Sequence, residues 1–198
     1  MARTIARDHE EKRLAILETA AKFFAENGFD RSSMNQLAAA CGVSKALIYH
    51  YYDSKDALLF DIVHSHLDDL LRVVEAVDLS DPDPGVTLRK LCAAILDAYR
   101  NADARHQVQQ VAMAALPENQ RSRLAAMQRR IVAIVSDVLR ATRPDYFAAN
   151  PERLTPVTMS LFGMLNWFYM WHRPDRGLSR TDYAYLAADL ILGGVEGL

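Results

Sequence analysis

Several features that would point to other classes of protein are scarce in this chain. It has only two cysteines and eight glycines among 198 residues. Cys41 and Cys92 lack metal-ligand spacing, so we expect structural thiols in a reducing cytoplasm. Few glycines and little alternation of apolar and polar residues argue against a β protein. We find no apolar run of membrane-spanning length and expect no signal peptide. An all-α cytoplasmic protein is therefore expected.

The chain also lacks a large excess of either charge, because its formal net charge is −2. Residues 1–56 hold as many basic as acidic groups, so this segment is neutral overall. If it binds nucleic acid, it must do so through a local basic face. Apolar residues make up 51% of the chain, which is enough for a packed core.

Two helices are predicted before residue 41. Apolar residues at helical spacing predict a first helix from about residue 10 to Asn27, where Asn27-Gly28 supplies a left-handed stop. Ser33 precedes a second helix and is followed three residues later by Gln36, which is the pattern of a capping box.

A tight turn and a third helix follow. Gly42 permits a positive φ at the turn, and Ser44 is placed to cap the third helix. Ile48 and Tyr52 share its inward face, so the Tyr52 hydroxyl needs a partner or solvent. Two short helices joined by such a turn are typical of a helix-turn-helix that docks in the DNA major groove.

The rest of the chain predicts a helical body. A fourth helix from about residue 53 to 77 is long enough to link a head to a body, and a proline-rich break follows at 78–85. About nine helices are expected in all, the later ones at about 85–101, 104–116, 118–142, 152–172 and 180–195. We divide the chain into a helix-turn-helix domain, 1–55, and a body, 56–198.

Residues 10–60 resemble the head of the TetR family of bacterial transcriptional regulators. The matching residues are Phe24, Gly28, Phe29, Ser33, Leu37, Ala38, Gly42, Val43, Ser44, Lys45, Ile48, Tyr49, Tyr51, Tyr52, Ser54, Lys55, Asp56, Ala57 and Leu58. The resemblance implies a three-helix head and a C-terminal bundle for ligand binding and dimerisation. It further implies a homodimeric repressor that leaves a palindromic double-stranded DNA operator when a small-molecule inducer binds, with no cofactor, catalysis or membrane contact.

The candidate DNA-contacting residues lie at helix starts and along the third helix. They are Ser33, Ser44, Lys45, Ala46, Leu47, Tyr49, His50, Tyr51 and Lys55. A helix N-terminus favours an anionic or acceptor group. Tyr49, His50 and Tyr51 offer donors toward phosphate oxygens, as the family's matching positions do, and Lys55 can add an ionic phosphate contact. Ala46 and Leu47 depart from the family pattern and would suit thymine methyl groups. The alternative is that Leu47 packs against a neighbouring helix.

A second resemblance covers residues 161–179. This segment is similar to TetR-family repressors of fatty-acid, phenylacetate and sterol-fragment degradation, which bind acyl-CoA thioesters. An acyl-CoA would need an apolar tunnel and cations for its phosphates. The candidate ligand-binding residues are Leu91, Ile95, Tyr99, Met113, Met127, Arg130, Ile131, Phe162, Trp167 and Trp171. Equally, the tryptophans and nearby methionines fit a core or a subunit interface.

The family also implies that the last two helices pair with a second subunit. Small residues at Ala187, Ala188, Gly193 and Gly194 would permit a close approach of helices there.

Two other functional classes compete with the DNA-binding interpretation. A metal-dependent enzyme could use His64 and His66 with nearby aspartates, but residues two apart on a helix point to different faces. No nucleophile elbow, P-loop or dinucleotide fingerprint is present. A dimeric helical adaptor without DNA binding is allowed by the neutral head. The set of candidate contact residues argues against it, because Ser33, Ser44, Lys45, Tyr49 and Lys55 are all present.

Overall fold

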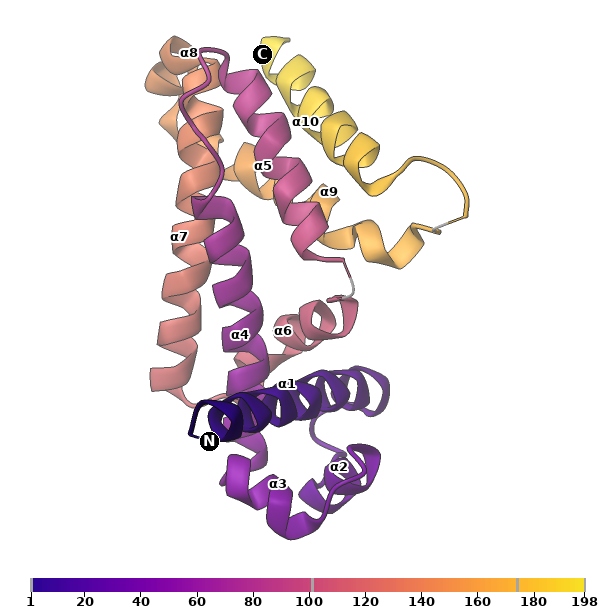
Figure 1. Cartoon of the computed structure of the whole chain (residues 1–198). Helices are drawn as coiled ribbons and strands as arrows, with labels where there is room; N and C mark the ends of the chain where they lie inside the picture. The colour runs from indigo at the N-terminus through magenta and orange to yellow at the C-terminus, as the bar shows by residue number, and fades with distance from the viewer. Residues whose placement is uncertain (1, 101, 174, 198) are drawn as a thin grey trace. The chain divides into compact units, whose positions relative to one another are not determined.

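The structure is a computed structural model that describes residues 2–100, 102–173 and 175–197. Within these ranges the chain forms α-helices and one 3-10 helix, without β-strands, which confirms the all-α prediction (Figure 1). The elements are α1 (Ala2–Asn27), α2 (Met34–Ala40), α3 (Lys45–Tyr51), α4 (Lys55–Glu75), α5 (Pro84–Ala98), α6 (Asp103–Ala115), α7 (Glu118–Thr142), α8 (Pro144–Ala149), η1 (Pro151–Arg153), α9 (Leu154–Trp171) and α10 (Arg180–Glu196). No helix in the described ranges is both long and apolar enough to span a bilayer.

The structure differs from the expected boundaries at two places. Helix α1 begins at Ala2 rather than near residue 10. An ion pair between Arg7 and Glu11, one turn apart, stabilises these additional turns. They lie before the apolar residues whose spacing predicted the helix. The short elements α8 and η1 were not predicted. Each begins with a proline, Pro144 or Pro151, which the sequence pattern alone marks as a helix break although proline is well suited to the first helical turn.

The chain forms two compact units that interleave along the sequence. The first unit comprises Met1–Leu67 and Asn101–Ala125, and the second comprises Asp68–Arg100 and Ala126–Leu198. Helices α4 and α7 each contribute residues to both units. The boundary between the units therefore does not lie at residue 55. The division into a helix-turn-helix domain, 1–55, and a body, 56–198, stays a prediction about function.

The core of the first unit gathers apolar side chains from α1, α2, α3 and α4. Phe24, Leu37, Ile48, Leu59 and Ile62 are each at most 3% exposed. Helix α6 packs on α1 in this unit. The short helices α2 and α3 are thus held by burial of a few large side chains, since helices of two turns are not stable alone.

The second unit is built around α5, which packs against α10 and α9 (Figure 1). A Cβ at Gly85, at the start of α5, would lie 3.1 Å from Asp83 Oδ1 and 3.4 Å from Leu192 Cδ1, so the N-terminal turn of α5 lies in contact with its cap and with α10. Ala187 and Ala188 are fully buried within the chain. The small residues that were expected to permit contact with a second subunit therefore include two that serve packing inside this unit.

Candidate nucleic-acid interface

Helix α2 and the turn after it take the conformation that their sequence predicts. The Ser33 hydroxyl accepts a hydrogen bond from the backbone N–H of Gln36, and the Ser33 N–H donates to Gln36 Oε1 at 2.9 Å. This confirms the capping box. It also occupies the Ser33 amide, so a phosphate contact through that amide would have to open the box. Gly42 has φ +65°, a left-handed conformation that favours glycine.

Helix α3 presents a polar face to solvent. Ser44 caps it, with its hydroxyl accepting a hydrogen bond from the Leu47 N–H at 3.1 Å. Ile48 and Tyr52 are buried as expected. The exposed residues at its start and along its outer face are Ser44, Lys45, Ala46, Tyr49 and His50. The structure therefore brings five of the nine predicted DNA-contacting residues onto one continuous surface.

Two of the predicted contact residues lie at the edge of this face. Leu47 and Tyr51 are half-buried. The Tyr51 ring packs on the His9 ring of α1 with 4.6 Å between centroids, and His50 lies 6.1 Å from the same imidazole. His9 was missed in the sequence analysis. It lies some forty residues away along the chain, and no local motif marks it as a neighbour of α3.

Lys55 at the start of α4 is engaged inside the first unit. Its ammonium donates to the backbone carbonyls of Phe29 at 2.7 Å, Ser32 at 3.0 Å and Asp30 at 3.4 Å. It also lies 4.2 Å from the centroid of the Phe29 ring. These contacts stabilise the loop between α1 and α2. A phosphate contact by Lys55 stays a prediction and would share the ammonium with these carbonyls.

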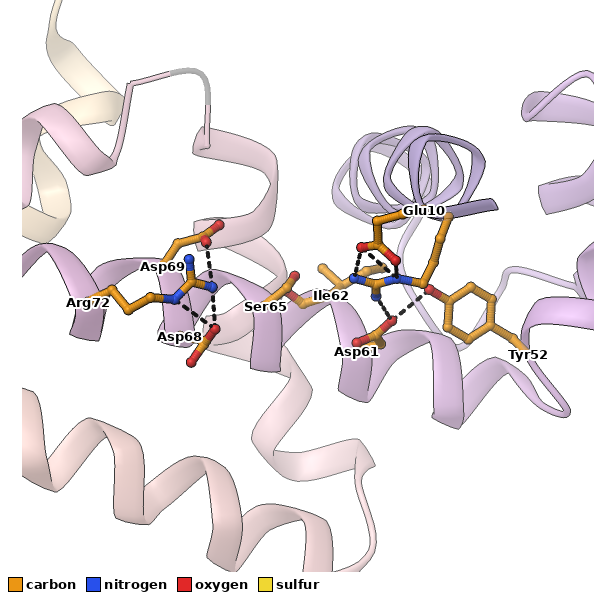
Figure 2. Close-up of polar contacts among 9 residues, drawn as sticks. Glu10, Tyr52, Asp61, Ile62, Ser65, Asp68, Asp69 and Arg72 are labelled. Atoms are coloured by element: carbon orange, nitrogen blue, oxygen red, sulfur yellow. Dashed lines mark hydrogen bonds and ion pairs between the residues drawn. The ribbon is translucent and has the colours of Figure 1, made fainter. Parts of the chain in front are cut away.

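A polar cluster joins the end of α3 to α1 and α4. The Tyr52 hydroxyl donates to Asp61 Oδ2 at 2.7 Å, and Arg13 Nη1 donates to the same oxygen at 2.5 Å (Figure 2). Arg13 also donates from Nε and Nη2 to Glu10. Burial and the Asp61 carboxylate raise the pKa of Tyr52, and hydrogen bonding to Glu10 raises the pKa of Arg13. The tyrosine is therefore a neutral donor to Asp61 near pH 7.

The rival metal site gains no support from side-chain positions. His66 is buried, whereas Asp68 and Asp69 pair with Arg72 (Figure 2). Among the residues that the structure describes, no three histidine, cysteine or acidic side chains gather as a metal would require. Cys41 and Cys92 are free thiols.

The predicted ligand-binding residues occupy different environments. Those buried in the second unit are Leu91, Ile95, Tyr99, Ile131 and Phe162. Met127 is half-buried, and Arg130 is exposed, with its Nε 3.2 Å from Glu75 Oε1. Met113 belongs to the first unit. Trp167 and Trp171 are 54% and 49% exposed, so they lie on the outside of the second unit.

Comparison with known proteins identifies the family. Residues 16–62 match the model of the bacterial regulatory proteins of the tetR family. Residues 81–195, more than half of the chain, match the tetracyclin repressor-like C-terminal domain. The chain belongs to the TetR family. Its capped α3 and the glycine turn before it thus form the helix-turn-helix of a TetR-type head.

Solved structures and curated proteins include similar TetR members. A TetR-family transcriptional regulator from Bordetella parapertussis 12822 is 38% identical, with 94% of this chain and 96% of that chain covered and a TM-score of 0.85. AibR, in a complex with isovaleryl coenzyme A and operator DNA, is 25% identical, with coverage of 92% and 97% and a TM-score of 0.72.

The transcriptional repressor KstR2 of Rhodococcus jostii (strain RHA1) is 32% identical over 95 residues, which are 48% of this chain and 45% of that protein. The matched segment thus spans less than half of the length of that curated relative.

Proposed function

We propose that the protein is a TetR-type transcriptional repressor that binds a palindromic DNA operator as a homodimer and releases it when a small-molecule effector binds. The observation that carries this proposal is the outward face of α3. Ser44, Lys45, Tyr49 and His50 are exposed there, while Ile48 and Tyr52 anchor the helix from the other side. A short helix anchored in this way can enter a major groove with its polar side chains toward bases and phosphates.

DNA binding by this head depends on local charge, since residues 1–56 are neutral overall. Lys45 supplies an exposed cation at the N-terminus of α3, where the helix dipole also favours an anion. The apolar side chain of Ala46 is exposed beside it and would suit a thymine methyl group. Leu47 is only partly exposed, so it combines packing with any base contact.

The test is a shift assay with a duplex that the protein selects from a randomised DNA library. Affinity should fall steeply as salt rises, because phosphate contacts release counterions. Replacement of Tyr49 by alanine should weaken binding without unfolding the protein, since its side chain is 41% exposed. Binding that does not change with salt, or full affinity of the Tyr49→Ala protein, would contradict the assignment of α3. Selection of no duplex would favour a helical adaptor.

The second unit supports the homodimer part of the proposal. Exposed apolar side chains recur on one face of α9 and on its neighbour α10; they are Met159, Trp167, Met170, Leu186 and Leu190. Gly163 and Gly193 lie on the same helices, and a Cβ at either would meet nothing within 4 Å. Large exposed apolar patches are uncommon on monomers and mark interaction surfaces. A two-fold dimer would cover this face and supply two recognition helices for a palindrome.

We further propose an acyl-CoA thioester as the effector. The solved complex of AibR contains isovaleryl coenzyme A, and this protein is similar to AibR over most of both chains. The second unit holds a part-buried polar pair that a thioester or acyl group could engage, in which the buried Tyr99 donates its hydroxyl hydrogen to Oδ1 of the half-buried Asn166 at 2.8 Å. Binding would shift the population of the repressor toward a state with lower operator affinity.

A thermal-shift screen tests the effector class. Acyl-CoA thioesters should raise the melting temperature, whereas the matching free acids and CoA alone should not. Equal stabilisation by the free acids, or no stabilisation by any thioester, would contradict the acyl-CoA part. Either result would leave the DNA-binding part to be judged by the shift assay.

A further inference from the structure

A polar cluster lies at the C-terminal end of α3 (Figure 2); it consists of Glu10, Arg13, Tyr52 and Asp61. None of these residues is among the proposed base or phosphate contacts. We infer that Tyr52 is a positioning residue for operator binding. Its hydroxyl bond to Asp61 fixes the orientation of α3 relative to α1 and α4. This inference rests on the proposed DNA-binding function and assigns a role to a side chain that does not itself reach the duplex.

Helix α3 is short, and few of its side chains are fully buried. It is seven residues long, and Ile48 is its only buried residue. The Tyr52 ring directly after it is 6% exposed and adds apolar contact. Apolar burial is not directional, so it holds a helix near its neighbours without fixing its rotation. A hydrogen bond to a carboxylate is directional and is stronger than a neutral one.

The acceptor in this bond is itself held in place. Arg13 Nη1 donates to the same oxygen of Asp61 that accepts from Tyr52, with distances of 2.5 and 2.7 Å. Glu10 holds the other side of the guanidinium through Nε and Nη2. The side chains of Arg13 and Asp61 are each 27% exposed, so solvent screens this pair less than a surface pair. The Tyr52 hydroxyl therefore donates to a carboxylate on α4 that an arginine of α1 holds in place.

A phenylalanine at position 52 would fill the same buried volume without this bond. We then expect α3 to be oriented less precisely, while the exposed Lys45 ammonium remains available to phosphates of any sequence. Contacts to base edges depend on that accuracy more than contacts to phosphates do. Specific binding should suffer, and binding to unrelated DNA should not.

The experiment compares the full-length protein with its Tyr52→Phe variant on two probes. One probe is the duplex that wild-type protein selects from a randomised library, and the other has the same composition in scrambled order. The variant should bind the selected duplex about tenfold more weakly, as for the loss of one hydrogen bond to a charged group. Its affinity for the scrambled duplex should be unchanged. Tyr146→Phe is the matched control, because it also removes a tyrosine hydroxyl that makes a side-chain hydrogen bond, here as the acceptor from Arg153, but it lies in the second unit.

A double-mutant cycle tests whether Tyr52 acts through Asp61. Asp61→Ala should weaken selective binding, and adding Tyr52→Phe to it should cost little more, because each change removes the hydrogen bond between Tyr52 and residue 61. Additive losses would overturn the proposed route. An equal fall of Tyr52→Phe affinity for both duplexes would show a general loss of the head and would also overturn it, as would wild-type selectivity in that variant. If wild-type protein selects no duplex, the proposed function fails, and this inference fails with it.

Discussion

The imidazole rings of His66 and His106 pack against each other inside the first unit, with centroids 5.8 Å apart and planes at 71°. His66 lies on α4 and His106 on α6, and the two residues are 2% and 3% exposed. Burial lowers the pKa of His66 to about 3, and the nearby His106 and Arg105 contribute further in the same direction. His66 is therefore neutral in the folded protein at any pH above about 4.

This burial predicts a loss of stability in mild acid. The pKa of His66 is below its ordinary value of 6.5 in the folded state, so the unfolded chain binds the additional proton. The stabilising contribution is full above pH 6.5 and is lost progressively as the pH falls toward 3. Urea unfolding should show that the difference in unfolding free energy between pH 7.5 and 5.5 is smaller by about 1 kcal/mol in a His66→Leu variant than in wild type.

The control for this prediction is the half-buried neighbour His64. A His64→Leu variant keeps His66 and should keep the greater part of the acid sensitivity. Equal pH dependence of wild type and His66→Leu would show that His66 does not govern the effect.

Lys45, the first residue of α3, and Lys55, the first residue of α4, should respond differently to the same substitution. Lys55→Met removes the hydrogen bonds to the Phe29 and Ser32 carbonyls and should lower the unfolding free energy by about 2 kcal/mol. Lys45 is exposed, so Lys45→Met should leave the unfolding free energy nearly unchanged. Instead it should reduce the slope of log affinity against log salt, by about 1 for each phosphate that the protein no longer neutralises.

The two readouts also test the phosphate contact predicted for Lys55. A reduced salt slope in Lys55→Met would show that its ammonium reaches DNA as well as the loop. An unchanged slope together with lower stability would confine Lys55 to its internal role. Unchanged stability would contradict the importance of the carbonyl contacts.

The turn before α3 makes a prediction about backbone conformation alone. Gly42 has φ +65°, and a Cβ there would meet no atom within 4 Å. Gly42→Ala should therefore destabilise the protein by about 1 kcal/mol through strain rather than a clash. Gly42→Asn should cost less, because asparagine adopts this conformation more readily. Thermal or urea unfolding of the two variants measures the difference, and equal costs would contradict strain as the cause.

The local features of the head could be predicted because their causes are local. The capping box of Ser33 and Gln36, the Ser44 cap and the positive φ of Gly42 each depend on residues within four positions of one another. The periodicity of α3 likewise predicted that Ile48 and Tyr52 face inward. Such patterns are governed by backbone geometry and helix period, which one sequence contains in full.

The partners of Tyr52 and Lys55 could not be predicted, because they depend on segments distant in the sequence. The sequence indicated that the Tyr52 hydroxyl needs a partner, but its link through Asp61 to Arg13 joins residues 39 positions apart and forms only when α1 packs on α4. The charge and position of Lys55 predict an ionic contact with phosphate, whereas its ammonium is held by loop carbonyls from residues 29–32. Carbonyl direction in a loop is set by the tertiary fold, so no residue pattern reveals it.

The exposed face of α9 and α10 leads to the last prediction. Leu190 is 56% exposed, so its replacement by glutamate should not unfold the second unit. In a dimer that buries this face, the change places a charge at each copy of the interface, where desolvation of an unpaired carboxylate is costly. Sedimentation should then show a dimer for wild type and a monomer for Leu190→Glu. Leu79→Glu is the matched control, because Leu79 is similarly exposed, at 48%, but lies in the loop after α4. The Leu79→Glu protein should remain a dimer. A Leu190→Glu dimer as tight as wild type would place the interface elsewhere. A monomeric wild type would contradict the homodimer, and with it the expectation that the selected duplex is a palindrome.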